Sequence, residues 1–71
     1  MEDVEFLERL GEKIAAIREK KGISQMELAR RLETGNNQIR RIEKGLVAAN
    51  IITLRKIANE LDASLATLLR L

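Results

Sequence analysis

The sequence predicts a single all-α domain, and three features of its composition support this class. The chain has 71 residues, which is the size of one small domain. It contains no proline and only four glycines, so few residues oppose a helix. Apolar residues make up 45% of the chain and are almost all aliphatic, with Phe6 the one aromatic residue. The remaining common residues, glutamate, lysine and arginine, are also compatible with helices.

The first helix is predicted over residues 3–21. Its apolar residues recur at helical spacing and share one face: Phe6, Leu7, Leu10, Ile14 and Ile17. Acidic residues crowd its start and basic residues its end, which suits the helix dipole, and Gly22 ends it. Gly11 interrupts the pattern, so either it permits a close helix crossing or the ordered helix begins only near Leu7. In the second case residues 1–6 form a partly ordered acidic leader.

Two short helices joined by a tight turn are predicted over residues 23–45. Ser24 is a favourable N-cap and Glu27 follows three residues later. This spacing predicts a capping box, in which each of the two side chains satisfies a backbone N–H of the first turn. A break at Gly35 separates this helix from the next, which is predicted over residues 36–44.

The helix over residues 36–44 combines an apolar inner face with a polar outer face. Ile39 and Ile42 lie on the inner side. The outer side carries two carboxamides and three cations: Asn36, Asn37, Arg40, Arg41 and Lys44. Carboxamides bind adenine edges, arginine binds guanine edges or phosphate, and an α-helix fits the major groove of DNA. An ordinary surface helix is also polar outside, but the absence of an acid here favours nucleic acid.

Two more helices are predicted, over residues 51–61 and 65–70. Asn50 is the N-cap candidate for the first and Ser64 for the second. The inner face of the first combines five apolar residues: Ile51, Leu54, Ile57, Ala58 and Leu61.

Charge and residue usage narrow the possible functions. Residues 1–12 carry a net charge of −4 and residues 13–71 carry +6, which suits a polyanionic partner for the body of the domain, or simply solubility. There is no cysteine or histidine, so disulfides, Cys/His zinc sites and histidine-based catalysis are excluded. We therefore expect no enzymatic activity and no bound metal, cofactor or small-molecule ligand.

The sequence also bears on localisation. No apolar run approaches ~20 residues and no signal peptide is recognisable, so we expect a cytoplasmic protein without a membrane span, which is nucleoid-associated when bound to DNA.

One ordered set of residues between Leu10 and Leu69 is more specific than any of its parts. It comprises Gly22-Ile23-Ser24-Gln25, Glu27-Leu28-Ala29, Leu32, Ile39, Ile42-Glu43-Lys44-Gly45, Thr53-Leu54, Ile57-Ala58, Leu61, Ser64-Leu65 and Leu68-Leu69. This set resembles the helix-turn-helix domain of the phage repressor and Cro family, also called the Xre family. The resemblance implies a compact bundle of five helices in which the second and third form the DNA-binding motif.

The resemblance also implies roles for individual residues. Base reading is implied for Asn36, Asn37 and Arg41. Phosphate contacts or bracing are implied for Ser24, Gln25, Gln38, Arg40 and Lys44. The glutamine at position 25 would brace the start of the recognition helix, and Arg18 and Glu43 would form a buried ion pair between the first and third helices.

Two positions depart from the family pattern. Many members have glycine where Glu33 stands, so the turn is expected to differ, with Gly35 adopting the left-handed backbone angles instead. Many members also have proline where Ala49 stands, and its loss should loosen the loop before the fourth helix without changing the fold.

The predicted function is sequence-specific binding of double-stranded DNA by a repressor-like transcriptional regulator. The alternative is a helical protein-interaction module, or an antitoxin-type partner-binding protein of the same fold. A homodimer on a palindromic operator is expected, through apolar residues not needed for the core: Leu46, Val47, Ile52, Leu65 and Leu71. A stand-alone regulator, an antitoxin, a restriction-modification controller and a fragment of a longer repressor all remain open.

Overall fold

A computed structural model describes all 71 residues and contains five helices and no strand. The helices are α1 (Asp3–Lys20), α2 (Gln25–Arg31), α3 (Asn36–Glu43), α4 (Ile51–Glu60) and α5 (Leu65–Leu68). The predicted all-α class and all five helices are confirmed. Four of the predicted ranges extend one or two residues too far, because Lys21, Lys44 and Leu61 are C-caps and the last helix ends before its C-cap, Leu69.

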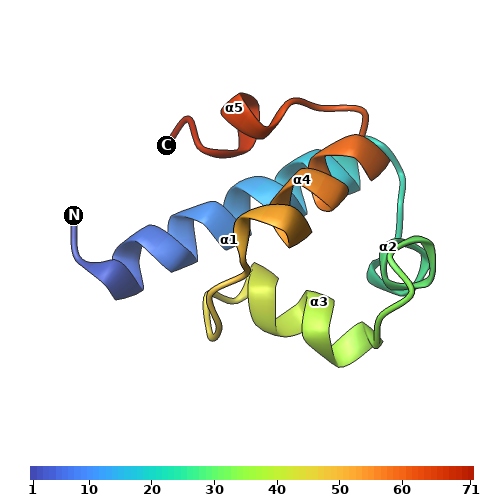
Figure 1. Cartoon of the computed structure of the whole chain (residues 1–71), viewed down its shortest axis with the longest axis horizontal. Coiled ribbons are helices and arrows are strands. Elements are labelled where there is room, and N and C mark those ends of the chain that lie inside the picture. The colour runs from blue at the N-terminus through green and yellow to red at the C-terminus, as the bar shows by residue number, and fades with distance from the viewer.

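The helices form a bundle around α1, which runs along the length of the molecule (Figure 1). In this view α5 lies above α1 and α3 lies below it, α4 crosses in front of the second half of α1, and α2 lies near the end where α1 finishes. Helix α3 packs against both α1 and α2, and α2 also contacts α4. This arrangement holds α3 on its inner side only, and its opposite side faces away from the bundle.

The core consists of eleven buried apolar residues, ten from the five helices and one, Leu61, from the C-cap of α4. They are Leu10, Ile14, Leu28, Ala29, Ile39, Ile42, Leu54, Ile57, Ala58, Leu61 and Leu68. Two residues predicted on inner faces are instead exposed: Phe6 at 39% and Ile51 at 55%. Phe6 lies in the first turns of α1, where residues 1–6 are all exposed and the bundle does not reach. Ile51 occupies the first turn of α4, ahead of the packed Leu54.

Helices α1 to α4 end in the same hydrogen-bonded turn, in which the residue after the C-cap has a left-handed backbone. Glycine fills this position after α1 and α3, but Glu33 fills it after α2 with φ 56° and Asp62 after α4 with φ 54°. Gly35 has φ −80° and is the N-cap of α3. The prediction that Gly35 would take the left-handed angles is therefore wrong, because the chain places that conformation at Glu33 itself.

Helices α1 and α3 cross closely at Gly11. A side-chain carbon at this position would collide with the backbone carbonyl groups of Ile42 and Glu43. Of the two explanations that the sequence left open for Gly11, the close crossing is correct. Helix α1 is continuous from Asp3, so the acidic leader is largely helical. The end of α3 is thereby pressed directly onto the backbone of α1.

Candidate nucleic-acid interface

The two faces of α3 differ sharply in exposure. On the inner face Ile39 and Ile42 are buried in the core. On the outer face, five polar residues are exposed: Asn36, Asn37, Gln38, Arg41 and Lys44. Arg40 is half-buried, and the first turn of the helix contains no acidic residue. The outer face therefore offers hydrogen-bond donors and positive charge without a competing carboxylate.

Arg18 and Glu43 form a buried ion pair that joins α1 to the end of α3. Arg18 Nε lies 2.6 Å from Glu43 Oε2, and Nη2 donates to Oε1 at 3.1 Å. The remaining guanidinium nitrogen, Nη1, donates to the carbonyl oxygen of Ile23 at 2.8 Å. The hydrogen bond to Glu43 raises the pKa of Arg18 above its ordinary value, against the opposing effect of burial. The pairing implied by the family resemblance is present, with paired, parallel hydrogen bonds.

Gln25, the first residue of α2, joins the same buried group. Its side-chain Nε2 donates to Glu43 Oε1 at 2.9 Å. The family resemblance implied that Gln25 braces the start of α3, but its contact is with the opposite end of that helix, where Glu43 lies. One amide hydrogen is used in this bond, and the other remains available to a ligand.

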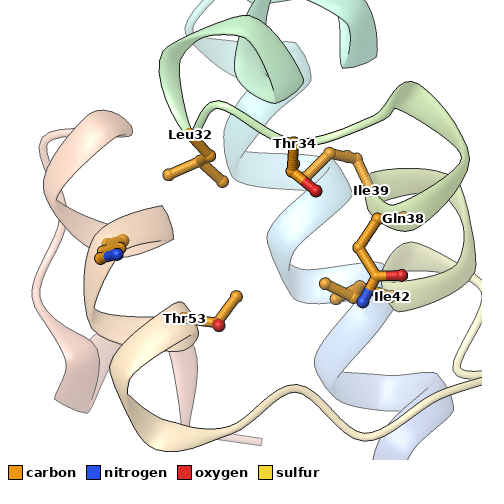
Figure 2. Close-up of a pocket in the computed structure, with 7 residues that line it drawn as sticks. Leu32, Thr34, Gln38, Ile39, Ile42 and Thr53 are labelled. Carbon is orange, nitrogen blue, oxygen red and sulfur yellow. The ribbon is translucent and has the colours of Figure 1, made fainter.

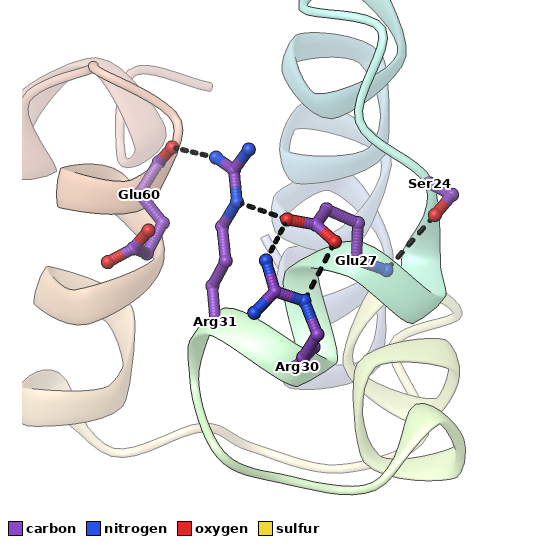
Figure 3. Close-up of polar contacts among 5 residues, drawn as sticks. All are labelled: Ser24, Glu27, Arg30, Arg31 and Glu60. Carbon is purple, nitrogen blue, oxygen red and sulfur yellow. Dashed lines mark hydrogen bonds and ion pairs between the residues drawn. The ribbon is translucent and has the colours of Figure 1, made fainter.

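Ser24 caps α2 as predicted, but the second half of the capping box is absent. Ser24 Oγ accepts from the Glu27 backbone N–H at 3.0 Å. The Glu27 carboxylate binds Arg30 and Arg31 instead of returning to the Ser24 backbone (Figure 3). Charged hydrogen bonds to two guanidinium groups are stronger than one to a neutral N–H, and they lower the pKa of Glu27 to about 2. Arg31 also reaches the carbonyl oxygen of Glu60, which links α2 to α4.

A groove of about 230 Å³ lies between α3, the turn before it and α4. Its lining consists of Leu32, Thr34, Gln38, Ile39, Ile42, Thr53 and Lys56. In Figure 2 the side chains of Gln38 and Thr53 flank this hollow from α3 and α4. Gln38 thus stands on the flank of α3 that faces α4, apart from the centre of the outer face.

The five apolar residues predicted as spare for a dimer differ in exposure. Leu46, Ile52 and Leu71 are exposed, at 65%, 49% and 39%. Val47 and Leu65 are half-buried and pack against the core. The premise that these two are not needed for the core is wrong, because the loop after α3 and the start of α5 fold back onto the bundle.

Among the contacts that were not predicted from the sequence, two involve polar residues expected to contact DNA. One is the bond between Gln25 and Glu43, and the other is a hydrogen bond from Arg40 Nη2 to Asn37 Oδ1 at 3.2 Å. The second has a sequence signal, because residues three apart on a helix are neighbours. The first has none, because it joins residues from different helices.

Comparison of the sequence with protein families matches the helix-turn-helix family HTH_3 over residues 14–68. No curated protein matches the chain. None of the five helices has both the length and the apolar composition that crossing a membrane requires.

Several solved structures of bacterial regulators share this fold. The clp gene regulator ClgR from Corynebacterium glutamicum superposes with a TM-score of 0.87 at 26% identity, over 90% of this chain and 68% of that one. An HTH_3 family transcriptional regulator from Vibrio cholerae gives a TM-score of 0.85 at 28% identity, over 94% of this chain and 38% of that one. The restriction-modification controller protein C.AhdI from Aeromonas hydrophila gives 0.84 at 26% identity, over 87% and 94%.

Proposed function

This chain belongs to the HTH_3 helix-turn-helix family, and from that premise we propose that it is a DNA-binding transcriptional regulator that reads a specific operator through α3. The observation that carries the proposal is the outer face of α3. This face combines exposed asparagines, Arg41 and Lys44 on a helix whose inner face is fixed in the core. The names of the similar structures, which are regulators and a controller protein, support the same class of function.

The proposed geometry inserts the exposed side of α3 into the major groove. Asparagine pairs with adenine through two hydrogen bonds, and arginine pairs with guanine in the same way. Asn36 or Asn37 would then read an A·T pair, and Arg41 would read a G·C pair. Lys44, at the C-cap of α3, would bind a DNA phosphate. The second amide hydrogen of Gln25, which is not used in the bond to Glu43, would donate to another phosphate of the DNA backbone.

The alternative function, a protein-interaction module, would call for a different outer face. A domain that binds protein through α3 would be expected to carry large apolar or aromatic residues at the centre of that face. None occurs on the outer face of α3, which carries asparagine, arginine and lysine side chains instead. DNA is therefore the partner that we propose.

We also propose that the regulator acts as a homodimer of repressor type on a palindromic operator. One short helix reads only a few base pairs, and two such helices about 34 Å apart read successive turns of B-DNA. Leu46, Ile52 and Leu71 are the exposed candidates for the contact between subunits. Sedimentation with and without operator tests this step, and a one-to-one complex on an asymmetric site would contradict it.

Selection of bound sequences from random duplex DNA tests the main proposal. We expect a recovered consensus with two-fold symmetry. An Arg41→Glu variant should lose binding, whereas a control Arg55→Glu variant, which changes an exposed arginine on α4, should recover the same consensus. Recovery of no consensus by the correctly folded wild-type protein would reject the proposal.

A further inference from the structure

Arg40 and Asn37 are linked by a side-chain hydrogen bond on the outer side of α3. The Arg40 guanidinium donates from Nη2 to Asn37 Oδ1 at 3.2 Å. A helical side chain leans toward the N-terminus of its helix, so Arg40 reaches back over the residue three positions earlier. Asn36, the other asparagine on this face, is exposed and has no such side-chain partner. The two asparagines are therefore not equivalent as readers of DNA.

The hydrogen bond determines which way the Asn37 amide is turned. Arginine carries five N–H donors and no acceptor, so its partner on Asn37 must be the carbonyl oxygen. The oxygen consequently faces Arg40, and the Nδ2 amino group lies on the opposite arm of the planar amide. Asn37 therefore offers a ligand its two N–H donors, while its acceptor oxygen is already engaged by Arg40.

We propose that Arg40 is a positioning residue that makes Asn37 a donor, directed at the acceptor-rich edge of a guanine; this rests on the proposed function. Guanine presents two acceptors in the major groove, N7 and O6, whereas adenine presents one acceptor and the N6 amino group. An adenine amino group approaching Asn37 Oδ1 would meet the guanidinium N–H groups of Arg40, donor against donor. Adenine recognition is thereby left to Asn36.

The arrangement also assigns Arg40 a role different from that of a simple phosphate contact. Arg40 is half-buried, while Arg41 and Lys44 on the same helix are exposed. A half-buried guanidinium that already donates to a neighbour loses less side-chain entropy on binding DNA than a fully exposed side chain does. Its remaining N–H groups lie next to Asn37 and extend the donor surface toward the second guanine acceptor.

The test measures the affinity of the whole chain for duplexes in which each base pair of a selected site is changed in turn. Four proteins are compared: wild type, Asn37→Ala, Arg40→Ala and the double variant. The base pair read by Asn37 is the one at which Asn37→Ala loses its preference. Arg55→Ala is the control, because Arg55 is an exposed arginine on α4, and thermal unfolding verifies that each variant is folded.

We expect wild type to prefer guanine over adenine at that base pair by about tenfold or more. Arg40→Ala should reduce this preference about tenfold or invert it, because the released oxygen can accept from adenine. In the Asn37→Ala background, Arg40→Ala should leave the preference at that base pair unchanged. Arg55→Ala should leave every preference unchanged.

Three results would overturn the proposal. Wild type could prefer adenine at the base pair that responds to Asn37→Ala, or Asn37→Ala could change no base preference. Arg40→Ala could also weaken all duplexes by one common factor, which would make Arg40 a phosphate contact. Each of these results leaves the proposed regulator intact, whereas failure of wild type to bind any duplex would reject the function itself.

Discussion

Gln25 donates its side-chain amide to Glu43 at 2.9 Å, across the junction between α2 and α3. The same carboxylate accepts two hydrogen bonds from Arg18 on α1. A single buried acid at the end of α3 therefore connects that helix to both of its neighbours. The orientation of the outer face of α3 depends on this connection, although none of its three members lies on that face.

Glu43→Ala is expected to destabilise the domain by ~3–5 kcal/mol, because it leaves the buried Arg18 charge without a partner. Gln25→Ala removes only one hydrogen bond to a charged group and should cost ~1.5 kcal/mol. The double variant Arg18→Met with Glu43→Leu should be more stable than Glu43→Ala alone. Urea denaturation of the four proteins measures these differences, and a cost below ~1 kcal/mol for Glu43→Ala would contradict the interpretation.

Gly11→Ala should destabilise the domain by more than about 3 kcal/mol, because the added carbon overpacks the crossing of α1 and α3. Gly35→Ala is the matched control: Gly35 has φ −80°, and a side-chain carbon there meets no atom within 4 Å. This control should change the stability by less than about 1 kcal/mol. Thermal unfolding compares the two variants, and equal effects would argue against a close crossing.

Glu33→Gly is expected to stabilise the domain by about 1 kcal/mol. Glu33 has φ 56° after α2, a left-handed backbone that residues with a side chain adopt at a cost of about 1–2 kcal/mol. Thr34→Gly, one residue later, serves as the control and should destabilise, because Thr34 has no positive φ. The free energies of unfolding of wild type, Glu33→Gly and Thr34→Gly test this prediction. A loss of stability in Glu33→Gly would count against strain at this turn.

Acid should weaken the link that Glu27 makes within α2. The hydrogen bonds to Arg30 and Arg31 lower the pKa of Glu27 from 4.5 to about 2 in the folded protein. The ionised carboxylate therefore stabilises the fold fully above pH ~4.5, and this contribution is lost as the pH falls toward about 2. The unfolding midpoints of wild type and Glu27→Gln, measured from pH 6 to pH 2, should converge as the pH falls. A constant difference across that range would disprove the linkage.

Arg41 and Lys44 should respond differently to DNA sequence and to salt. Arg41→Ala is expected to cost about 1–3 kcal/mol on the selected operator and to relax preference at one position. Lys44→Ala should weaken binding to all duplexes alike and reduce the slope of log affinity against log salt, because it removes a phosphate contact. Fluorescence anisotropy at several salt concentrations distinguishes the two. If Arg41→Ala weakens operator and random duplexes equally, Arg41 contacts phosphate instead.

The number and order of the helices could be predicted from the sequence because local signals mark them. Ser24, Asn50 and Ser64 each accept from the backbone N–H three residues later, and all three are recognisable N-caps in the sequence. The inner faces were only partly predictable. The apolar spacing that includes Leu10 and Ile14 also includes Phe6, and periodicity does not reveal where along a helix its neighbours begin to cover it.

The contacts of the candidate site were less predictable than the identities of its residues. The outer residues of α3 follow from helical geometry, so the exposure of Asn36, Asn37, Arg41 and Lys44 could be predicted, whereas Arg40 on the same side is half-buried. The partner of Gln25 could not be predicted, because it lies on another helix and only the packing of α2 against α3 brings the two side chains together. The partners of Glu27, three and four residues later on its own helix, are compatible with helical spacing, but the capping box competes for the same carboxylate. The turn after α2 was also mispredicted. The preference of glycine for left-handed backbone angles favoured Gly35, but the hydrogen bonds that end α2 require those angles at Glu33.

The close crossing at Gly11 has a consequence for redesign of this domain. Because α3 is fixed through its backbone carbonyls and its inner side chains, its position does not depend on what its outer side chains are. Asn36, Asn37 and Arg41 can therefore be exchanged for other residues while the helix keeps its place. The domain is suited to serve as a scaffold for libraries of altered operator preference, in which a handful of codons is varied and the remainder of the gene is left untouched.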